Sequence, residues 1–282
     1  MTKLIYTFNE LNQELNFSEK PIALIPTMGA LHDGHKSLIE EALKENKTVI
    51  VYIFVNPLQF GPQEDFNIYP RDLNKDFKLC QNLNVHYVFA PEVNEVFPDL
   101  NNFQNNLIQP PEELENILCG KTRINHFKGV ATVIKRFLDL INPDSIYFGK
   151  KDLQQIYIIK WLLKEYGYST SLTACPTVRE PSGLALSSRN SFLSPEEKII
   201  ASKIYESLKL AKDYVKSGMC ATKKAILEAL IFLSQYKEIK VEYFEARDTN
   251  SLKETDDKKN SDFYFFIAAR IGKVRLIDNI EL

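Results

Sequence analysis

Short apolar runs alternate with amphipathic helical patterns along the first 175 residues, and this alternation restricts the fold more than any other feature of the sequence. The apolar runs have the length of buried strands and lie at residues 21–26, 48–55, 85–90, 145–149 and 170–178. Apolar residues at helical spacing predict helices between them, at residues 35–46, 72–83, 130–141 and 152–167. Strands that alternate with helices form βαβ units, so residues 1–175 are predicted to form an α/β domain with a doubly wound parallel sheet.

The order of elements changes in the C-terminal part of the chain. Two amphipathic helical patterns and then three strand-like runs follow one another, at residues 195–218, 222–236, 240–246, 263–269 and 273–280. Helices followed by strands are typical of a small α+β domain, here predicted over residues 176–282. The polar, charged segment 251–262 is expected to be a mobile loop between two of these strands.

Composition narrows the class of protein. With 282 residues, 44% of them hydrophobic and 26% charged, the chain can bury a core of globular size. A formal net charge of -2 argues against a protein that coats nucleic acid or docks on a membrane through a polybasic segment. No apolar run approaches the roughly 20 residues of a spanning helix, and residues 1–17 lack the apolar centre and cleavage site of a signal peptide.

Cysteine usage agrees with this picture. The widely spaced Cys80, Cys119, Cys175 and Cys220 form no C-x-x-C pair and are expected to be reduced thiols. Together with the charge balance they predict a cytoplasmic protein that binds neither nucleic acid nor membrane.

Two histidines lie close together where the first predicted strand gives way to a helix, in the stretch IPTMGALHDGHKSLIEEA at residues 25–42. Strand, glycine loop and helix together place backbone N–H groups and a helix dipole where a phosphate can bind. Neutral imidazoles of His32 and His35 could donate hydrogen bonds to that phosphate, and protonated ones could neutralise its charge. The spacing alone leaves two other interpretations open: a metal site, which would need a third ligand, or histidines that only cap the helix.

The same stretch contains PTMGALHDGH, which resembles the HxGH signature of the nucleotidylyltransferase superfamily, a group that includes the class I aminoacyl-tRNA synthetases. In this longer form it is similar to the pantothenate synthetase (pantoate–β-alanine ligase) family. A weaker similarity lies at RLIDN, residues 275–279. Other blocks resemble the same family in the same order: IFVNPLQFGPQEDFNIYPR at 53–71, HFKGVATVIKRFLDLINPD at 126–144, YFGKKDLQQ at 147–155 and REPSGLALSSRNSFL at 179–193.

The resemblance implies a Rossmann-like fold of the HIGH superfamily with a C-terminal lid domain, and a two-step reaction. Pantoate carboxylate attacks the α-phosphorus of ATP to give pantoyl adenylate and pyrophosphate. The β-alanine amine then attacks the activated carbonyl, so that AMP and pantothenate are released. The resemblance makes His35 the catalytic proton donor with His32 beside it. Mg²⁺ is implied by triphosphate chemistry, and a homodimer formed through the N-terminal domain is typical of the family.

The resemblance also assigns residues to each substrate. Gln59, Gln155 and Asn56 are assigned to pantoate and β-alanine, and Asp76 is a candidate helper of the magnesium ion. Lys150 occupies a variable position of its motif. The residues assigned to ATP are Met28, Gly29, Ala30, Leu31, His32, Asp33, Gly34, His35, Gly149, Lys150, Lys151, Asp152, Val178, Leu186, Ser187, Ser188 and Arg189.

Other classes of protein share the HxGH signature. Another adenylyl- or cytidylyltransferase, or a tRNA synthetase fragment, would share HxGH but is not expected to combine NPLQF, FGKKDLQQ and SSRN. The near-neutral charge disfavours a tRNA partner. A binding protein with a decayed site would have lost phosphate ligands, whereas each expected ligand here keeps the right chemical type. Two positions depart from the family pattern: Ser182 stands where aspartate is usual, and Lys128 replaces the commoner arginine.

Overall fold

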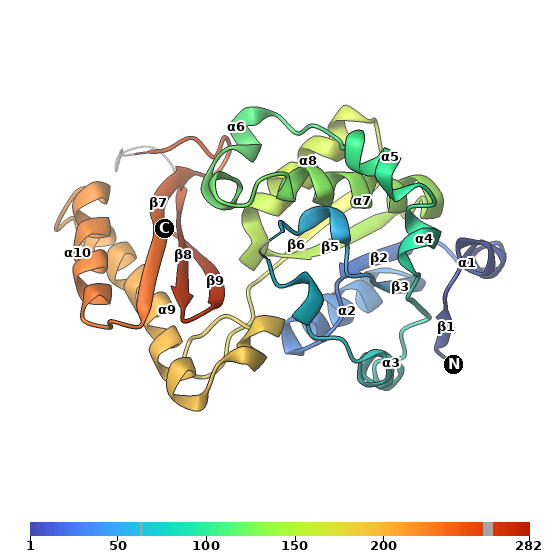
Figure 1. Cartoon of the computed structure of the whole chain (residues 1–282), viewed down its shortest axis with the longest axis horizontal. Helices are drawn as coiled ribbons and strands as arrows, with labels where there is room; N and C mark the ends of the chain where they lie inside the picture. The colour runs from blue at the N-terminus through green and yellow to red at the C-terminus, as the bar shows by residue number, and fades with distance from the viewer. Residues whose placement is uncertain (63, 256–261) are drawn as a thin grey trace. The chain divides into compact units, whose positions relative to one another are not determined.

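The computed structural model describes residues 1–62, 64–255 and 262–282 (Figure 1). The chain divides into two compact units, Met1–Pro176 and Thr177–Leu282. Each unit has a sheet and a hydrophobic core of its own.

The described part of the N-terminal unit contains a parallel sheet of six strands in the order β1-β4-β3-β2-β5-β6. The chain runs from β2 outward to β3 and β4 on one side, and β5 then pairs with the other side of β2. The strand order therefore reverses at β2, as in doubly wound α/β proteins. The parallel sheet predicted from the alternating pattern is confirmed. The strands are β1 Lys3–Ile5, β2 Ile22–Thr27, β3 Thr48–Ile53, β4 Tyr87–Phe89, β5 Ser145–Gly149 and β6 Ser171–Cys175.

Helices connect these strands, and each begins or ends where the sequence favours it. Gly167, with φ +67°, follows the last turn of the helix before β6, as expected for a glycine after a helix C-terminus. The helix predicted at 130–141 begins earlier, at His126. The helices of this unit are α1 Phe8–Leu15, α2 Asp33–Glu45, α3 Leu73–Asn82, α4 Val93–Val96, α5 Leu100–Asn105, α6 Glu112–Glu115, α7 His126–Ile141 and α8 Leu153–Glu165.

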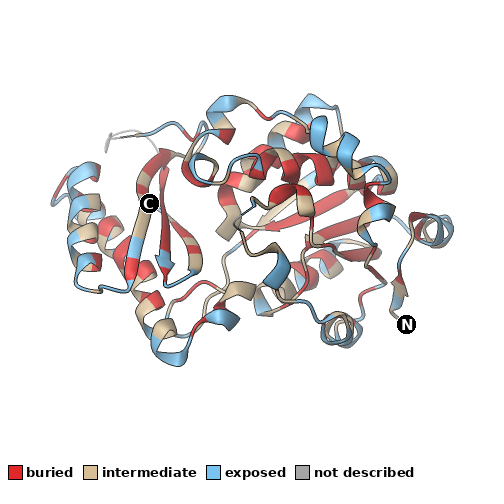
Figure 2. Cartoon of the chain, in the orientation of Figure 1, coloured by how far each residue is buried: buried red, intermediate tan, exposed pale blue. Residues whose placement is uncertain are grey.

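The sheet is buried on both faces (Figure 2), because alternate side chains of a strand point to opposite sides. Val49 and Val51 of β3 join a buried cluster with Ile39 of α2. Tyr52 points the other way and stacks on Phe137 of α7, with ring centroids 3.9 Å apart. Helices thus cover both faces of the sheet. In such sheets ligands bind at the loops that follow the carboxyl ends of the strands.

The described C-terminal unit pairs two helices with an antiparallel sheet of three strands in the order β7-β8-β9. Its first helix begins with Ser194 as N-cap in a capping box with Glu197. The α+β arrangement predicted for this part is confirmed. The expected mobile loop at 251–262 falls largely on residues 256–261, which lie outside the described residues. The elements are α9 Pro195–Lys216, α10 Thr222–Ser234, β7 Ile239–Asp248, β8 Phe263–Ile271 and β9 Val274–Glu281.

Candidate active site

The loop between β2 and α2 lies at the point where the strand order of the sheet reverses. Gly29 has φ +80° and Ala30 has φ +50°, so the chain makes a left-handed turn directly after the strand. A Cβ atom on Gly29 would lie 3.0 Å from Oδ2 of Asp76 and 3.1 Å from Cγ2 of Ile53. Backbone conformation and close packing therefore both require glycine at position 29.

Asp76 of α3 holds this loop in place. Its Oδ2 and Oδ1 atoms accept the backbone N–H groups of Ala30 and Leu31 at 2.9 Å and 2.7 Å. The side chain is buried, and burial raises the pKa of Asp76 although the two hydrogen bonds oppose that shift. Both carboxylate oxygens are thus engaged with the loop backbone. Within the described residues no group of three or more His, Cys, Asp or Glu side chains could hold a metal ion.

The two histidines cap α2. Nδ1 of His32 accepts the Gly34 N–H at 3.1 Å, and Nδ1 of His35 accepts the His32 N–H at 3.3 Å. Because each Nδ1 atom is an acceptor, the proton of each neutral ring must sit on Nε2. Helix capping and phosphate binding are therefore compatible: each Nδ1 atom serves the helix, and each Nε2–H group remains a donor.

Electrostatics favour the neutral rings. Burial lowers the pKa of His32 to about 4, with a further contribution from the positive charge of Lys151. Burial likewise lowers the pKa of His35 well below its ordinary value, and His32 and Lys151 add to that effect. The two ring centroids are 4.1 Å apart. Lys151 follows β5, so the structure brings the second predicted motif next to the histidine loop.

The segment FGKKDLQQ separates into residues with different tasks. Lys151 and Asp152 form an ion pair at 3.5 Å before α8 begins. Gln154 is buried. Its side chain accepts the Cys119 N–H at 3.0 Å and donates to the carbonyl oxygens of Leu114 and Ile117. Gln155 is only half-buried. A Cβ atom on Gly149 would meet nothing within 4 Å, so open space lies beside the end of β5.

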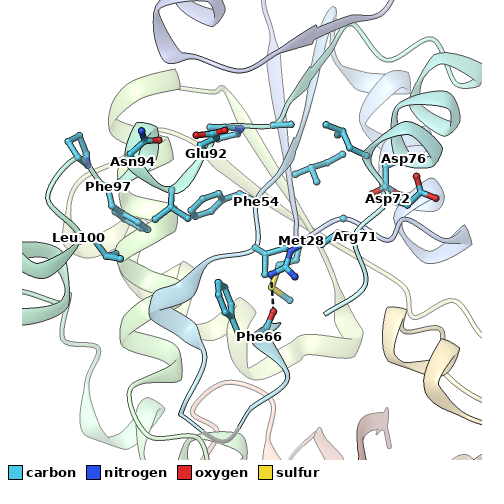
Figure 3. Close-up of a pocket in the computed structure, with 18 residues that line it drawn as sticks. Met28, Phe54, Phe66, Arg71, Asp72, Asp76, Glu92, Asn94, Phe97 and Leu100 are labelled. Atoms are coloured by element: carbon cyan, nitrogen blue, oxygen red, sulfur yellow. Dashed lines mark hydrogen bonds between the residues drawn. The ribbon is translucent and has the colours of Figure 1, made fainter. Parts of the chain in front are cut away.

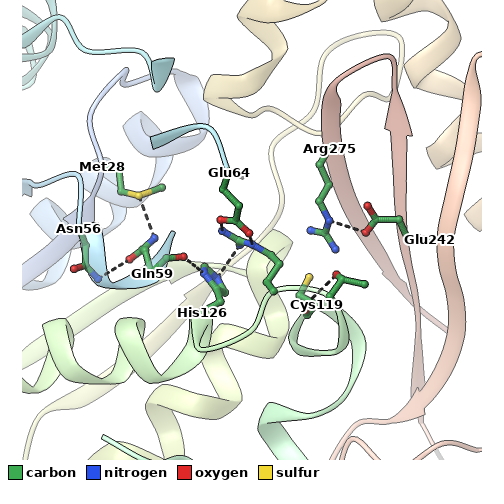
Figure 4. Close-up of polar contacts among 10 residues, drawn as sticks. Met28, Asn56, Gln59, Glu64, Cys119, His126, Glu242 and Arg275 are labelled. Atoms are coloured by element: carbon green, nitrogen blue, oxygen red, sulfur yellow. Dashed lines mark hydrogen bonds and ion pairs between the residues drawn. The ribbon is translucent and has the colours of Figure 1, made fainter. Parts of the chain in front are cut away.

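The loop after β3 places an amide next to the loop between β2 and α2. Gln59 is held through its Oε1 atom, which accepts from Nδ2 of Asn56 at 3.1 Å (Figure 4). Its Nε2 group therefore points to the thioether sulfur of Met28, 3.1 Å away. Asn56 is 1% exposed and also donates to the Gly129 carbonyl. In this arrangement Asn56 orients Gln59, and Gln59 carries the available donor.

The SSRN segment belongs to the C-terminal unit. The Ser187 hydroxyl accepts the Arg189 N–H at 3.3 Å at the start of a short 3₁₀ helix. Ser188 and Arg189 are half-buried. The Leu186 N–H donates to the Val178 carbonyl at 3.0 Å, so these two expected ATP residues are neighbours in a tight hairpin. The remaining expected residues, from Met28 to Asp152, lie in the N-terminal unit.

An ion pair between Arg179 and Asp278, neither of which is a predicted site residue, holds this hairpin. The guanidinium of Arg179 bonds both carboxylate oxygens of Asp278 at 2.5 Å and 2.8 Å, and it lies over the ring of Tyr205. Asp278 is the aspartate of the RLIDN block, so the weaker similarity there marks the anchor of the SSRN hairpin. Of the two departures from the family pattern, Ser182 is exposed at the tip of this hairpin, next to Gly183, whose carbonyl also accepts from Arg179. Lys128 lies in the N-terminal unit, 3.8 Å from Glu115.

A cavity of about 790 Å³ adjoins the loop between β2 and α2 from the side of β3 and β4 (Figure 3). Among the described residues its lining includes Met28 and Gly29 but neither imidazole. Its walls are mainly apolar, with Phe54 and Phe97 among the larger side chains. The cavity thus adjoins the loop that carries the two histidines, but neither imidazole lines it.

These features define a class. A doubly wound parallel sheet, with a glycine loop and a helix N-terminus at its switch point, is the architecture of α/β nucleotide-binding enzymes. The chain belongs to the pantoate–β-alanine ligase family, because the model of that family matches residues 2–281. It is a ligase of pantothenate biosynthesis. Among the described residues, no helix is long and apolar enough to cross a membrane.

Individual relatives agree over nearly the whole chain. The pantothenate synthetase of Coprothermobacter proteolyticus is 43% identical over 281 residues, which cover 99% of this chain and 97% of that protein. A crystal structure of the enzyme from Thermus thermophilus has a TM-score of 0.93 at 36% identity and covers 99% of each chain. The Francisella tularensis ligase, solved with β-γ ATP and β-alanine, has a TM-score of 0.82 at 36% identity and covers 99% of this chain and 97% of its own.

Proposed function

We propose that the loop from Met28 to His35 is where this ligase activates its acid substrate. The reaction is the ATP-dependent condensation of pantoate with β-alanine to give pantothenate. In the proposed route the pantoate carboxylate attacks the α-phosphorus of ATP and pyrophosphate leaves. The amine of β-alanine then attacks the carbonyl of pantoyl adenylate, the bond from that carbon to the AMP oxygen breaks, and AMP departs.

The observation that carries this proposal is the fixed tautomer of His32 and His35. Both Nδ1 atoms accept backbone N–H groups, so both Nε2–H groups are donors at the N-terminus of α2. A neutral donor of this kind can bond phosphate oxygens and strengthen that bond as negative charge builds in the transition state. Lys151, close enough to depress both pKa values, supplies the full positive charge. His35 is assigned the main catalytic role and His32 the role of its partner.

Pantoate is assigned to the two glutamines with available amides. The Nε2 group of Gln59 points to a thioether, which is a weak acceptor that a carboxylate or hydroxyl oxygen can replace. Gln155 is half-buried one position after the structural Gln154. Asn56 acts on pantoate and β-alanine through its bond to Gln59.

ATP is assigned to the loops that end the two central strands and to the SSRN hairpin. Met28 to His35 and Gly149 to Asp152 provide backbone groups, Lys151 a charge and Asp152 a carboxylate for the ribose hydroxyls. Ser187, Ser188 and Arg189 provide hydroxyl and guanidinium donors of the kind that clamp phosphates. We infer that the C-terminal unit serves as the lid that carries these donors.

Magnesium fits this site as an ion carried by the triphosphate. Mg²⁺ retains several water ligands and binds few carboxylates when it accompanies a nucleotide, and Asp76 already gives both oxygens to the loop. When bound, the ion would neutralise charge on the phosphate oxygens. We further infer a homodimer in the cytoplasm, and the four free, buried cysteines agree with a reducing compartment.

A product assay tests the proposal. Purified protein with ATP and Mg²⁺ should release pyrophosphate when pantoate is present, and should release AMP and pantothenate only when β-alanine is added as well. Release of ADP, or AMP formation that does not depend on pantoate, would contradict the proposed route.

A further inference from the structure

The loop after β3 is bonded at Gln59 to the first residue of α7, His126, and at Glu64 to Arg123, which lies just before that helix. The Gln59 carbonyl lies 2.8 Å from Nδ1 of His126, and Nε2 of His126 lies 2.8 Å from Nη1 of Arg123 (Figure 4). The same guanidinium donates to both carboxylate oxygens of Glu64 through Nε and Nη2, at 2.8 Å and 2.7 Å. The chain of contacts therefore starts and ends in the loop.

The protonation states along this chain follow from its geometry. A backbone carbonyl can only accept, so Nδ1 of His126 must carry the proton that it donates to Gln59. Arginine stays protonated, so its Nη1–H group donates and Nε2 of His126 accepts. His126 is thus held neutral in one tautomer by a cation on one side and a carbonyl on the other.

Close packing supports the same contact. A Cβ atom on Gly129 of α7 would lie 2.2 Å from the Leu58 carbonyl oxygen and 2.7 Å from the Gln59 nitrogen, so the helix touches the loop backbone directly. Asn56 adds a third bond by donating to the Gly129 carbonyl at 3.1 Å. The first turn of α7 therefore determines where the backbone of Gln59 lies.

We propose that Glu64, Arg123 and His126 are positioning residues for pantoate. The proposal rests on the proposed function, in which the Nε2 group of Gln59 contacts that substrate. Because the carboxamide of Gln59 is already turned toward Met28 by Asn56, the position of its backbone decides whether the amide reaches the acid. A misplacement of about 1 Å in a substrate-positioning group can reduce rates by about 10²-fold. The ion pair between Arg123 and Glu64 fixes a second point of the same loop.

Kinetics of single and double variants test the proposal. Glu64→Gln and Arg123→Gln should each raise the KM for pantoate by about tenfold while the KM for ATP stays within twofold. Since both residues act in one chain of contacts, the double variant should be no worse than the worse single variant. Lys135→Gln is the matched control: Lys135 also lies on α7 and forms an exposed ion pair with Asp139, and it should change neither KM.

A conservative rescue separates positioning from general stability. Asparagine at position 126 can still donate to the Gln59 carbonyl, whereas alanine cannot. His126→Asn should therefore recover part of the pantoate affinity lost in His126→Ala. If the KM values for pantoate and ATP instead rise in parallel with a fall in Tm, or if neither changes in Glu64→Gln and Arg123→Gln, the positioning role is overturned.

A readout that needs no activity distinguishes this inference from the proposed function. Arg123→Gln should accelerate amide hydrogen exchange over residues 57–62 of the ligand-free protein and leave α9 unchanged. If wild-type protein forms no pantoate-dependent AMP, the proposed function fails, and the exchange comparison still reports on the loop. Equal exchange rates over residues 57–62 in variant and wild type would show that Arg123 does not hold this loop in place.

Discussion

Nδ1 of His35 accepts the backbone N–H of His32 at 3.3 Å, and this one bond joins the fold to the chemistry. It caps the helix, and it also forces the His35 proton onto Nε2, the ring atom that can reach a phosphate. The capping interpretation and the catalytic interpretation of the HxGH spacing are therefore two sides of the same geometry. Sequence spacing alone could not choose between them, because it does not show which ring nitrogen is engaged.

Loss of the His35 donor should slow the reaction strongly. His35→Ala should reduce kcat by about 10²–10³-fold, the range for removing one donor that stabilises a transition state. His35→Gln keeps an amide near the Nε2 position and should lose less. Steady-state AMP formation measures both variants, and a His35→Ala enzyme within threefold of wild type would refute the assigned role.

Two adjacent glutamines should behave differently. Gln155→Ala should raise the KM for pantoate far more than the KM for ATP, because its half-buried amide is assigned to the acid. Gln154→Ala should instead lower the free energy of unfolding by about 1–3 kcal/mol, since it removes the partners of buried backbone groups. Equal KM changes for both substrates in Gln155→Ala would count against the pantoate assignment.

The carboxylate of Asp76 should be needed to hold the loop between β2 and α2, which is proposed to bind ATP. Asp76→Asn places an NH₂ group against one of two backbone N–H donors, Ala30 or Leu31. The variant should lose about 1–3 kcal/mol of stability and raise the KM for ATP by about tenfold. Asp72→Asn is the control on the same helix, because asparagine caps a helix as well as aspartate does. Unchanged ATP kinetics in Asp76→Asn would show that the loop does not depend on this anchor.

Stability should depend on pH through the histidine pair. The pKa of His32 is about 4 in the folded protein against an ordinary 6.5, and that of His35 is lowered in the same direction. The unfolded chain therefore binds more protons between those values, so the free energy of unfolding should fall as pH drops from 6.5 toward 4. His32→Gln should reduce this pH dependence, measured as urea midpoints across that range. The same slope in wild type and variant would contradict the low pKa of His32.

Much of the fold could be predicted from periodicity, because a parallel sheet buried on both faces requires continuous apolar strands. Helix α1 is absent from the sequence prediction, although its start carries a readable signal: Thr7 and Glu10 form a capping box. The helix is short and has few apolar residues, so its pattern is easily missed in the sequence. The early start of α7 at His126 is hard to predict because Asn125 precedes it with a positive φ and no side-chain cap.

The site is harder to predict from the sequence than the fold, because its contacts join residues that are far apart in the chain. The loop between β2 and α2 is held by Asp76, which is 46 positions from Ala30 in the chain, and no local pattern reveals such a contact. Spacing also cannot tell that Gln154 is committed to the backbone while Gln155 is not, or that Asn56 spends its donors on Gln59 and Gly129. The family motifs locate these residues, and only the three-dimensional contacts separate ligands from supports.

Isotope transfer tests the central claim most directly. If pantoate labelled with ¹⁸O in its carboxylate attacks the α-phosphorus of ATP, one labelled oxygen must pass to AMP when the amide bond forms. AMP that carries one ¹⁸O atom, detected by mass spectrometry, is expected in an amount equal to the pantothenate formed. Unlabelled AMP, or label in pyrophosphate or inorganic phosphate, would contradict activation of the acid as an adenylate at this site.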